Sequence, residues 1–170
     1  MTTLEAWDHR PIEEAHLFNP AFCGALAYEF LKSYIKAAAK PGADLPLIFC
    51  ALPICLHMES RRKLPSSTAT SLYTWLQRRP ETLVGYAVRA RDLAPYIKQG
   101  LSFGIARQTL AFGENGAVLL GEKRAAFTPK FLEAATAEVR DIVMSTRMLG
   151  RWFAGAGTAA TVLAAWGITV

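Results

Sequence analysis

The chain contains three histidines and three cysteines, the side chains best suited to binding a metal or attacking a substrate. Zinc sites use such ligands at short fixed spacings, but the sequence has no HxxxH, HExxH or CxxC pattern. The cysteines lie in apolar runs, which favours a role as small core residues in the reducing cytosol. We therefore expect neither a zinc site nor a cysteine nucleophile. The residues concerned are His9, His16, His57, Cys23, Cys50 and Cys55.

Motifs for nucleotide binding and acyl transfer are missing as well. The sequence contains no GxxxxGK[ST] loop, no strand followed by GxGxxG and no GxSxG elbow. The glycines within residues 150–157 have aromatic residues between them, which favours close helix packing or a hinge over a phosphate loop. A small-molecule site built from His57, Glu59 and Arg61 is the remaining alternative. We predict no catalytic residues, no enzyme activity and no cofactor.

Several arginines and aromatic residues lie among prolines and polar residues. Arginine and tryptophan are frequent in interface hot spots because they combine a large contact area with directed hydrogen bonds. The alternative is internal capping and ion pairing. We predict that loss of these side chains impairs folding or partner binding, and the sequence does not separate the two effects. The candidates are Arg10, Phe18, Phe22, His57, Arg61, Trp75, Arg151 and Trp152.

The chain is basic, with 19 lysines and arginines against 14 acidic residues and a formal charge of +5. This balance is compatible with binding to the phosphates of DNA. The basic residues are spread along the chain, so a solvated surface is the alternative. The candidates for phosphate contacts are Arg61, Arg62, Lys63, Arg78, Arg79, Arg89, Arg91 and Arg107.

Composition indicates a single domain that spans residues 1–170 and has a large apolar surface to cover. Hydrophobic residues make up 52% of the chain and charged residues only 19%. We expect part of this excess to lie in an interface with other subunits. The apolar stretch Leu45–Leu56 is too short to span a bilayer, and Trp152–Val170 is rich in glycine, alanine and threonine. With no signal peptide at the start, we predict a cytoplasmic protein without a membrane anchor.

Hydrophobic spacing predicts helices over most of the chain, with a change to strand-like alternation near residue 109. Asn115-Gly116 favours a tight turn there, so we predict a β-hairpin from Thr109–Phe112 and Ala117–Leu120. The predicted helices are Pro11–Phe18, Ala21–Lys40, Pro46–His57 with a kink at Pro53, a helix capped within 66–68 and ended by Pro80, Leu83–Leu93, Pro95–Gln108, Pro129–Ala154 and Thr158–Trp166.

The expected fold is mainly α, a compact helical domain with one β-hairpin. Two helices followed by a hairpin is the order at the end of a winged helix, in which the hairpin packs beside a helix that can enter a DNA groove. A helical protein with one isolated hairpin is the alternative.

Five segments together resemble a family of bacterial proteins, the middle components of three-component ABC systems. LFNPAFC and LGRWFA are their most distinctive parts, and none of the five is a catalytic signature. The segments are RPIEEAHLFNPAFCGAL (10–26), LPLIFCALPICLHMESRRKLP (45–65), SLYTWLQRRPE (71–81), RARDLAPYIKQGLSFG (89–104) and LGRWFAGAGTAATVLAAWGI (149–168).

The resemblance implies an adaptor subunit encoded beside an ABC ATPase of the chromosome-maintenance (SMC) and break-repair type. A third protein of such systems carries an effector domain, and the middle component would bridge it to the ATPase. These systems are regarded as anti-phage modules, and related middle components look like winged-helix proteins. The resemblance defines no catalytic residues. DNA would be contacted either directly or through the assembled complex.

Overall fold

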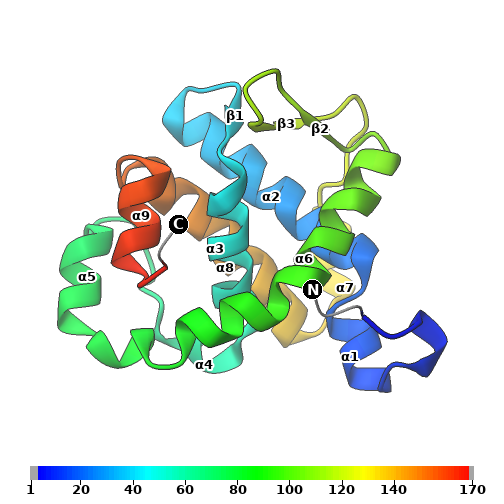
Figure 1. Ribbon diagram of the computed structural model, residues 1–170, viewed down its shortest axis with the longest axis horizontal. Coiled ribbons are helices and arrows are strands. Elements are labelled where there is room, and N and C mark those ends of the chain that lie inside the picture. The colour runs from blue at the N-terminus through cyan, green and yellow to red at the C-terminus, as the bar shows by residue number, and fades with distance from the viewer. Residues whose placement is uncertain (1–3, 169–170) are drawn as a thin grey trace.

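The computed structural model describes residues 4–168 and is mainly helical, with a small sheet at one end (Figure 1). The prediction of a mainly helical fold with a β-hairpin is confirmed. In chain order the elements are the 3-10 turn η1 (Trp7–His9), α1 (Ile12–Leu17), α2 (Pro20–Ala38), β1 (Gly42–Ala43), α3 (Leu45–Leu56), α4 (Met58–Lys63), α5 (Leu72–Arg78), the 3-10 turn η2 (Pro80–Leu83), α6 (Tyr86–Ala106), β2 (Leu110–Phe112), β3 (Val118–Leu120), α7 (Pro129–Ala134), α8 (Ala137–Ala154) and α9 (Ala159–Ala165).

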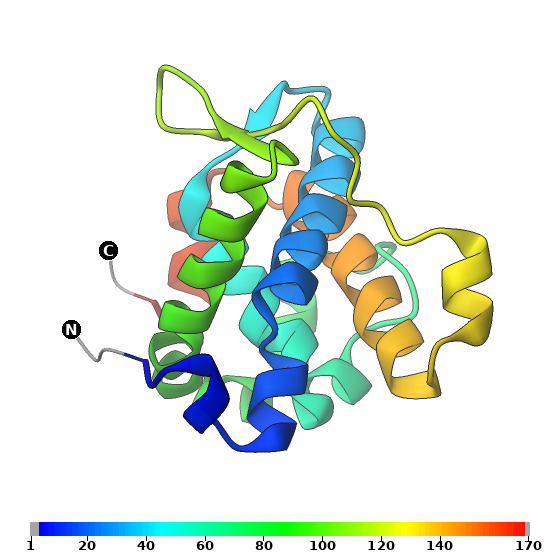
Figure 2. The same cartoon turned by 90° about the vertical axis from the view of Figure 1, so that its right-hand side faces the viewer.

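Helix α2 runs through the middle of the molecule, between α6 and α8 (Figure 2). Its start is encoded locally: the Asn19 side chain accepts hydrogen bonds from the Ala21 and Phe22 amides at 2.8 and 3.3 Å. Pro20 occupies the first turn, where its missing N–H costs nothing. The helix ends at Ala38, before Ala39 in the left-handed conformation (φ 52°). The predicted helix over Ala21–Lys40 is confirmed to within two residues.

Glycines allow α2 to approach both of its neighbours closely. A Cβ on Gly100 of α6 would lie 2.6 Å from the Cys23 Cβ and 2.9 Å from the Gly24 nitrogen. On the other side of α2, a Cβ on Gly150 of α8 would lie 2.5 Å from the Phe30 carbonyl oxygen. Real Cβ atoms do not approach this closely, so both helix crossings require glycine. This confirms the interpretation of Gly150 as a packing residue.

The sheet has three antiparallel strands in the order β1-β3-β2. The predicted hairpin of β2 and β3 is confirmed, and its turn contains Gly116 at φ 77°. Strand β1 was not predicted; it pairs Gly42 with Leu119 and Ala43 with Val118. A Cβ on Gly42 would lie 2.6 Å from the Val118 carbonyl oxygen, which explains why glycine occupies this edge. The winged-helix interpretation stays a prediction.

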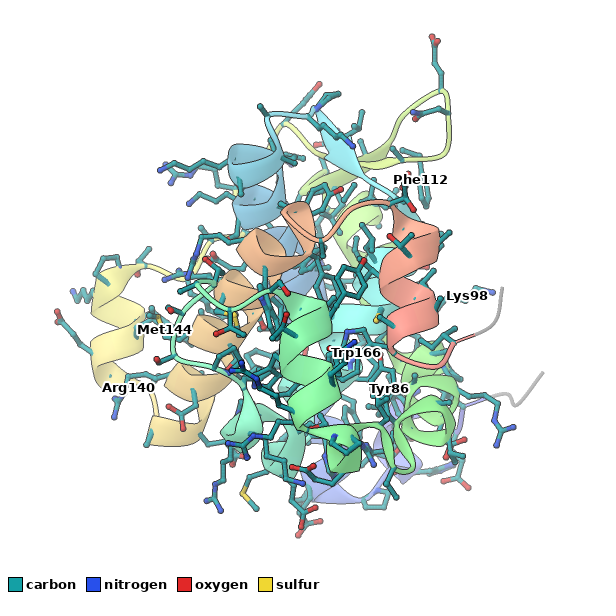
Figure 3. The ribbon with its side chains drawn as sticks, turned by 90° about the vertical axis from the view of Figure 1, so that its left-hand side faces the viewer. Tyr86, Lys98, Phe112, Arg140, Met144 and Trp166 are labelled. Carbon is teal, nitrogen blue, oxygen red and sulfur yellow. The ribbon has the colours of Figure 1, made fainter. Side chains whose placement is uncertain are left out.

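Helix α3 is buried along most of its length, as its all-round apolar sequence predicts. Beside it, aromatic side chains from three other helices form a cluster. Trp166 lies 4.8 Å from Tyr86 and 6.3 Å from Trp75 between ring centroids, and the Tyr86 hydroxyl donates to the Cys50 carbonyl at 2.7 Å. Figure 3 shows Tyr86 and Trp166 side by side in the interior. The cluster fixes α5, α6 and α9 around α3.

The prediction of two helices over Leu83–Leu93 and Pro95–Gln108 is wrong, because a single helix, α6, covers most of both ranges. Pro95 lies inside it. The proline ring removes one helical hydrogen bond and bends the helix, but packing against α2 and α3 stabilises both halves. The bend is visible in Figure 1.

The long helix predicted over Pro129–Ala154 is also wrong, because the chain forms two helices, α7 and α8. Thr136 separates them and caps α8 by accepting a hydrogen bond from the Val139 amide at 3.3 Å. A threonine side chain that bonds to the backbone competes with helix continuation. Two smaller errors concern residues 58–78. Ser71, and not a residue within 66–68, caps α5. Helix α4 was not predicted.

Replacing Gly100 by alanine should lower the free energy of unfolding by about 1–3 kcal/mol, because the added methyl group overpacks the crossing of α2 and α6. Denaturation in urea, followed by tryptophan fluorescence, measures this change. Gly155→Ala is the matched control, because the nearest atom to its Cβ is 3.8 Å away and its φ of −91° suits alanine. Equal stability of both variants would contradict the proposed role of the crossing.

Candidate interaction surface

The predicted interface residues Trp75 and Trp152 are in the core. Their side chains are 7% and 3% exposed, and their rings pack edge to face at 5.4 Å. The Trp152 indole N–H donates to the Thr70 carbonyl at 2.8 Å, which holds the loop before α5 against α8. Loss of either tryptophan therefore acts first on folding.

Arg61 is also buried, with 7% exposure. Its guanidinium donates to the Cys55 carbonyl at 2.7 Å, near the end of α3, and to Glu138 of α8 at 3.3 Å. A cation at a helix C-terminus is favourable because the last carbonyls lack helical partners. Arg61 was predicted both as a partner contact and as a phosphate contact, and the structure buries its side chain between α3 and α8, although the neighbouring Arg62 is exposed.

His57 caps α4, with its Nδ1 accepting from the Ser60 amide at 3.3 Å. Arg89 of α6 donates to the Ser60 hydroxyl at 3.3 Å, so its charge lies close to the imidazole. Burial and, secondly, Arg89 lower the pKa of His57 below its ordinary value of 6.5. A hollow of about 300 Å³ lies beside His57, but Glu59 and Arg61 do not line it. Of the three residues of the predicted small-molecule site, only His57 therefore lines this hollow.

Arg10 and Phe18 both contact Tyr96 of α6. The Arg10 guanidinium lies 5.7 Å from the centre of the Tyr96 ring and donates to Gln99 at 3.1 Å, and the Phe18 ring lies 4.7 Å from the same ring. The Tyr96 hydroxyl donates to Glu14 of α1. Burial, followed by this hydrogen bond, raises the pKa of Tyr96 to about 12. Tyr96 thus joins the N-terminal segment to α6.

The remaining two interface candidates lie far apart in the sequence and in different surroundings. Phe22 is half-buried and packs edge to face on Phe127 at 5.7 Å. Arg151 is exposed and lines a hollow of about 280 Å³ beside α5.

The basic residues do not form one continuous patch. Arg107 is at the C-terminal end of α6, roughly 27 Å along the helix from Arg89 at the helical rise of 1.5 Å per residue. Its guanidinium lies 5.2 Å from the centre of the Phe103 ring. Most of the others lie on α4, at the end of α5 and at the start of α6. Of these, the exposed side chains are Arg62, Arg78, Arg79 and Arg91.

Sequence reasoning missed a buried ion pair between Glu29 of α2 and Arg147 of α8. Arg147 donates to both Glu29 oxygens, at 2.8 and 3.0 Å, and Glu29 is 1% exposed. Glu29 also accepts from the Phe127 amide at 2.8 Å, while Arg147 donates to the Phe127 carbonyl at 3.1 Å. The hydrogen bonds with Glu29 raise the pKa of Arg147. The sequence feature that could have revealed this ion pair is the single glutamate within the apolar run of α2.

The cysteines are buried and free, as predicted. Burial raises the pKa of each thiol to about 12, so all three are protonated at neutral pH. Within residues 4–168, no three histidine, cysteine or acidic side chains group in a way that could hold a metal ion.

Two adjoining hollows lie along the outward face of α6, with volumes of about 1000 and 540 Å³. Phe49 of α3, Arg91 and Ala94 line both, so the two hollows are neighbours, and together we call them the α6 groove. Its wider part is bordered by the N-terminal segment around Leu4 and its narrower part by α9 and Ile168. The two ends of the described chain lie on this side of the molecule (Figure 2).

Residues 7–170 match the family described as ABC-three component (ABC-3C) system Middle Component 3. The match covers nearly the whole chain, and the protein therefore belongs to this family. Membership implies that it associates with the other components of such a system. No curated protein and no solved structure matches the chain. The family suggested by its sequence segments is thereby confirmed.

Among the helices of the described residues, none combines the length and the apolar character needed to cross a bilayer.

Glu29→Ala should lower the free energy of unfolding by about 3–5 kcal/mol, because it leaves the Arg147 charge without its buried partner. Glu133→Ala removes an exposed carboxylate from α7 and should change stability by less than about 0.5 kcal/mol. Urea denaturation of both variants measures the difference. A loss in Glu29→Ala no larger than in the control would show that the ion pair is dispensable.

Stability should fall as the pH decreases below 6.5, in part because of His57. The pKa of His57 is lower than 6.5 in the folded state, so the unfolded chain binds the proton first as the pH falls. Proton binding to the unfolded chain lowers the free energy of unfolding, and this loss increases until the pH falls below the folded-state pKa. His57→Asn keeps a side chain that caps helices well but does not titrate. Thermal unfolding from pH 7.5 to 5 should therefore show a shallower decline for this variant. Parallel curves would exclude His57 as a contributor.

Proposed function

We propose that the protein is a non-enzymatic adaptor that bridges an SMC-type ABC ATPase and an effector protein in a cytoplasmic anti-phage system. The observation that carries this proposal is the family match over residues 7–170, which places the chain among the middle components of three-component ABC systems. A middle component with two partners needs surface for both of them.

The chemistry of the described residues is compatible with an adaptor. Burial keeps the thiols of the three cysteines protonated, and His57 is engaged in capping α4. The α6 groove is lined mainly by apolar and small side chains. Such a surface suits contacts with another protein.

A DNA-binding module, acting alone or within the complex, is the second candidate. It is supported by the strand that precedes α3 and joins the hairpin in the order β1-β3-β2, an arrangement compatible with a winged helix. Exposed arginines at α4 and α5, such as Arg62 and Arg78, could contact phosphates. Affinity for a short DNA duplex that decreases steeply with salt would favour this candidate, and no affinity at low salt would exclude it.

The adaptor proposal predicts co-purification with both neighbours. The tagged protein, expressed with the ATPase and the effector encoded beside it, should retain both after size-exclusion chromatography. It should also be required for the ATPase and the effector to migrate together. If these two proteins associate equally well without it, or if the tagged protein elutes alone, the bridging role is wrong.

A further inference from the structure

We propose that the α6 groove binds an amphipathic helix of a partner protein, with its apolar face toward α6 and acidic residues beside Arg91 and Lys98. This inference rests on the adaptor function and names the surface that would serve it.

The face of α6 that lines the groove has the spacing of one helix surface. Ala87, Arg91, Ala94, Lys98 and Ser102 follow one another at intervals of three or four residues, and all five line the groove. They span about 22 Å at 1.5 Å per residue, which corresponds to four helical turns. Three of the five are alanine or serine, and small side chains allow another helix to approach closely. The groove therefore has the length and the shape for a short helix.

Apolar side chains border this face on both sides. Leu163 and Ile168 line the narrower hollow, and Leu4 and Phe103 line the wider one. Phe49 lies where the two hollows meet. A helix in this position would bury its apolar stripe in the same way as other helices that bind in grooves.

The charge along the groove is positive. Arg91 and Lys98 are exposed and lie two helical turns apart, and Figure 3 shows Lys98 pointing away from the core. The contact of Arg91 with Asp92 is long, at 3.8 Å, and exposed, so it leaves the arginine available to another carboxylate. At the wider hollow Arg10 and Glu5 contribute one charge of each sign, and Arg10 is already engaged with Tyr96 and Gln99. The complementary partner is a helix with acidic residues about seven positions apart.

The same geometry disfavours DNA as the occupant. A recognition helix must project from the protein to enter the major groove, which is about 12 Å wide. Helix α6 instead has the N-terminal segment on one side and α9 on the other, and both contribute to the walls of the hollows. A single helix can lie in such a depression, whereas these walls would prevent a DNA duplex from reaching α6.

Charge reversal in the full-length protein tests the proposal. Arg91→Glu combined with Lys98→Glu should reduce retention of one partner, either the ATPase or the effector, by about tenfold or more in the co-expression experiment. Lys32→Glu combined with Lys36→Glu makes the same change in charge on exposed positions of α2, outside the groove, and should retain both partners. Thermal unfolding of both double variants checks that they are folded.

A photo-crosslinking residue at Ser102 identifies what the groove contacts. The expected product joins Ser102 to an acidic helix of the ATPase or the effector, and reversing the acidic residues of that helix should restore binding to the Arg91→Glu, Lys98→Glu variant. If the wild type retains both partners and this variant retains them equally, the groove proposal is wrong while the adaptor function stands. Loss of DNA binding without loss of either partner would assign the groove to nucleic acid. If the wild type retains no partner, both proposals are wrong.

Discussion

The close crossing of α2 with α6 and with α8 is the constraint on which the rest of the structure depends. Side chains are absent at Gly24 and Gly100 on one side of α2 and at Gly150 on the other, so backbone packs directly on backbone. Close-packed interiors tolerate little change in volume, which fixes the relative position of the three helices. The positions of α3, the sheet and the aromatic cluster follow from this frame.

The frame also determines which face of α6 meets the solvent. Gly100 and Gly104 turn inward, toward α2 and the sheet, and this leaves Arg91 and Lys98 on the outward side. One helix thus supplies both a core contact and the candidate docking face. The bend at Pro95 lets its two halves follow the body of the molecule, with α3 and α9 beside the first half and the N-terminal segment beside the second.

Polar contacts hold the connecting segments to the helical frame. Arg10 and Tyr96 tie the N-terminal segment to α6, and Glu29 with Arg147 ties the connection before α7 to the core. Most residues singled out for partner binding therefore have a role inside the fold as well. An arginine or tryptophan has the same chemistry in a core as at an interface, so residue type could not separate the two, and only burial shows that Trp152 belongs to the core.

The sequence by itself determined the helical class, the hairpin and the family, because periodicity, Asn-Gly turns and the order of distinctive segments are local properties. It could not determine what depends on residues distant in the chain. Strand β1 is two residues long and is defined only by pairing with β3, and α6 continues through Pro95 only because both halves pack on other helices. The ion pair of Glu29 joins residues 118 positions apart. The α6 groove is likewise built from segments at both ends and in the middle of the chain, so only the tertiary structure could show it.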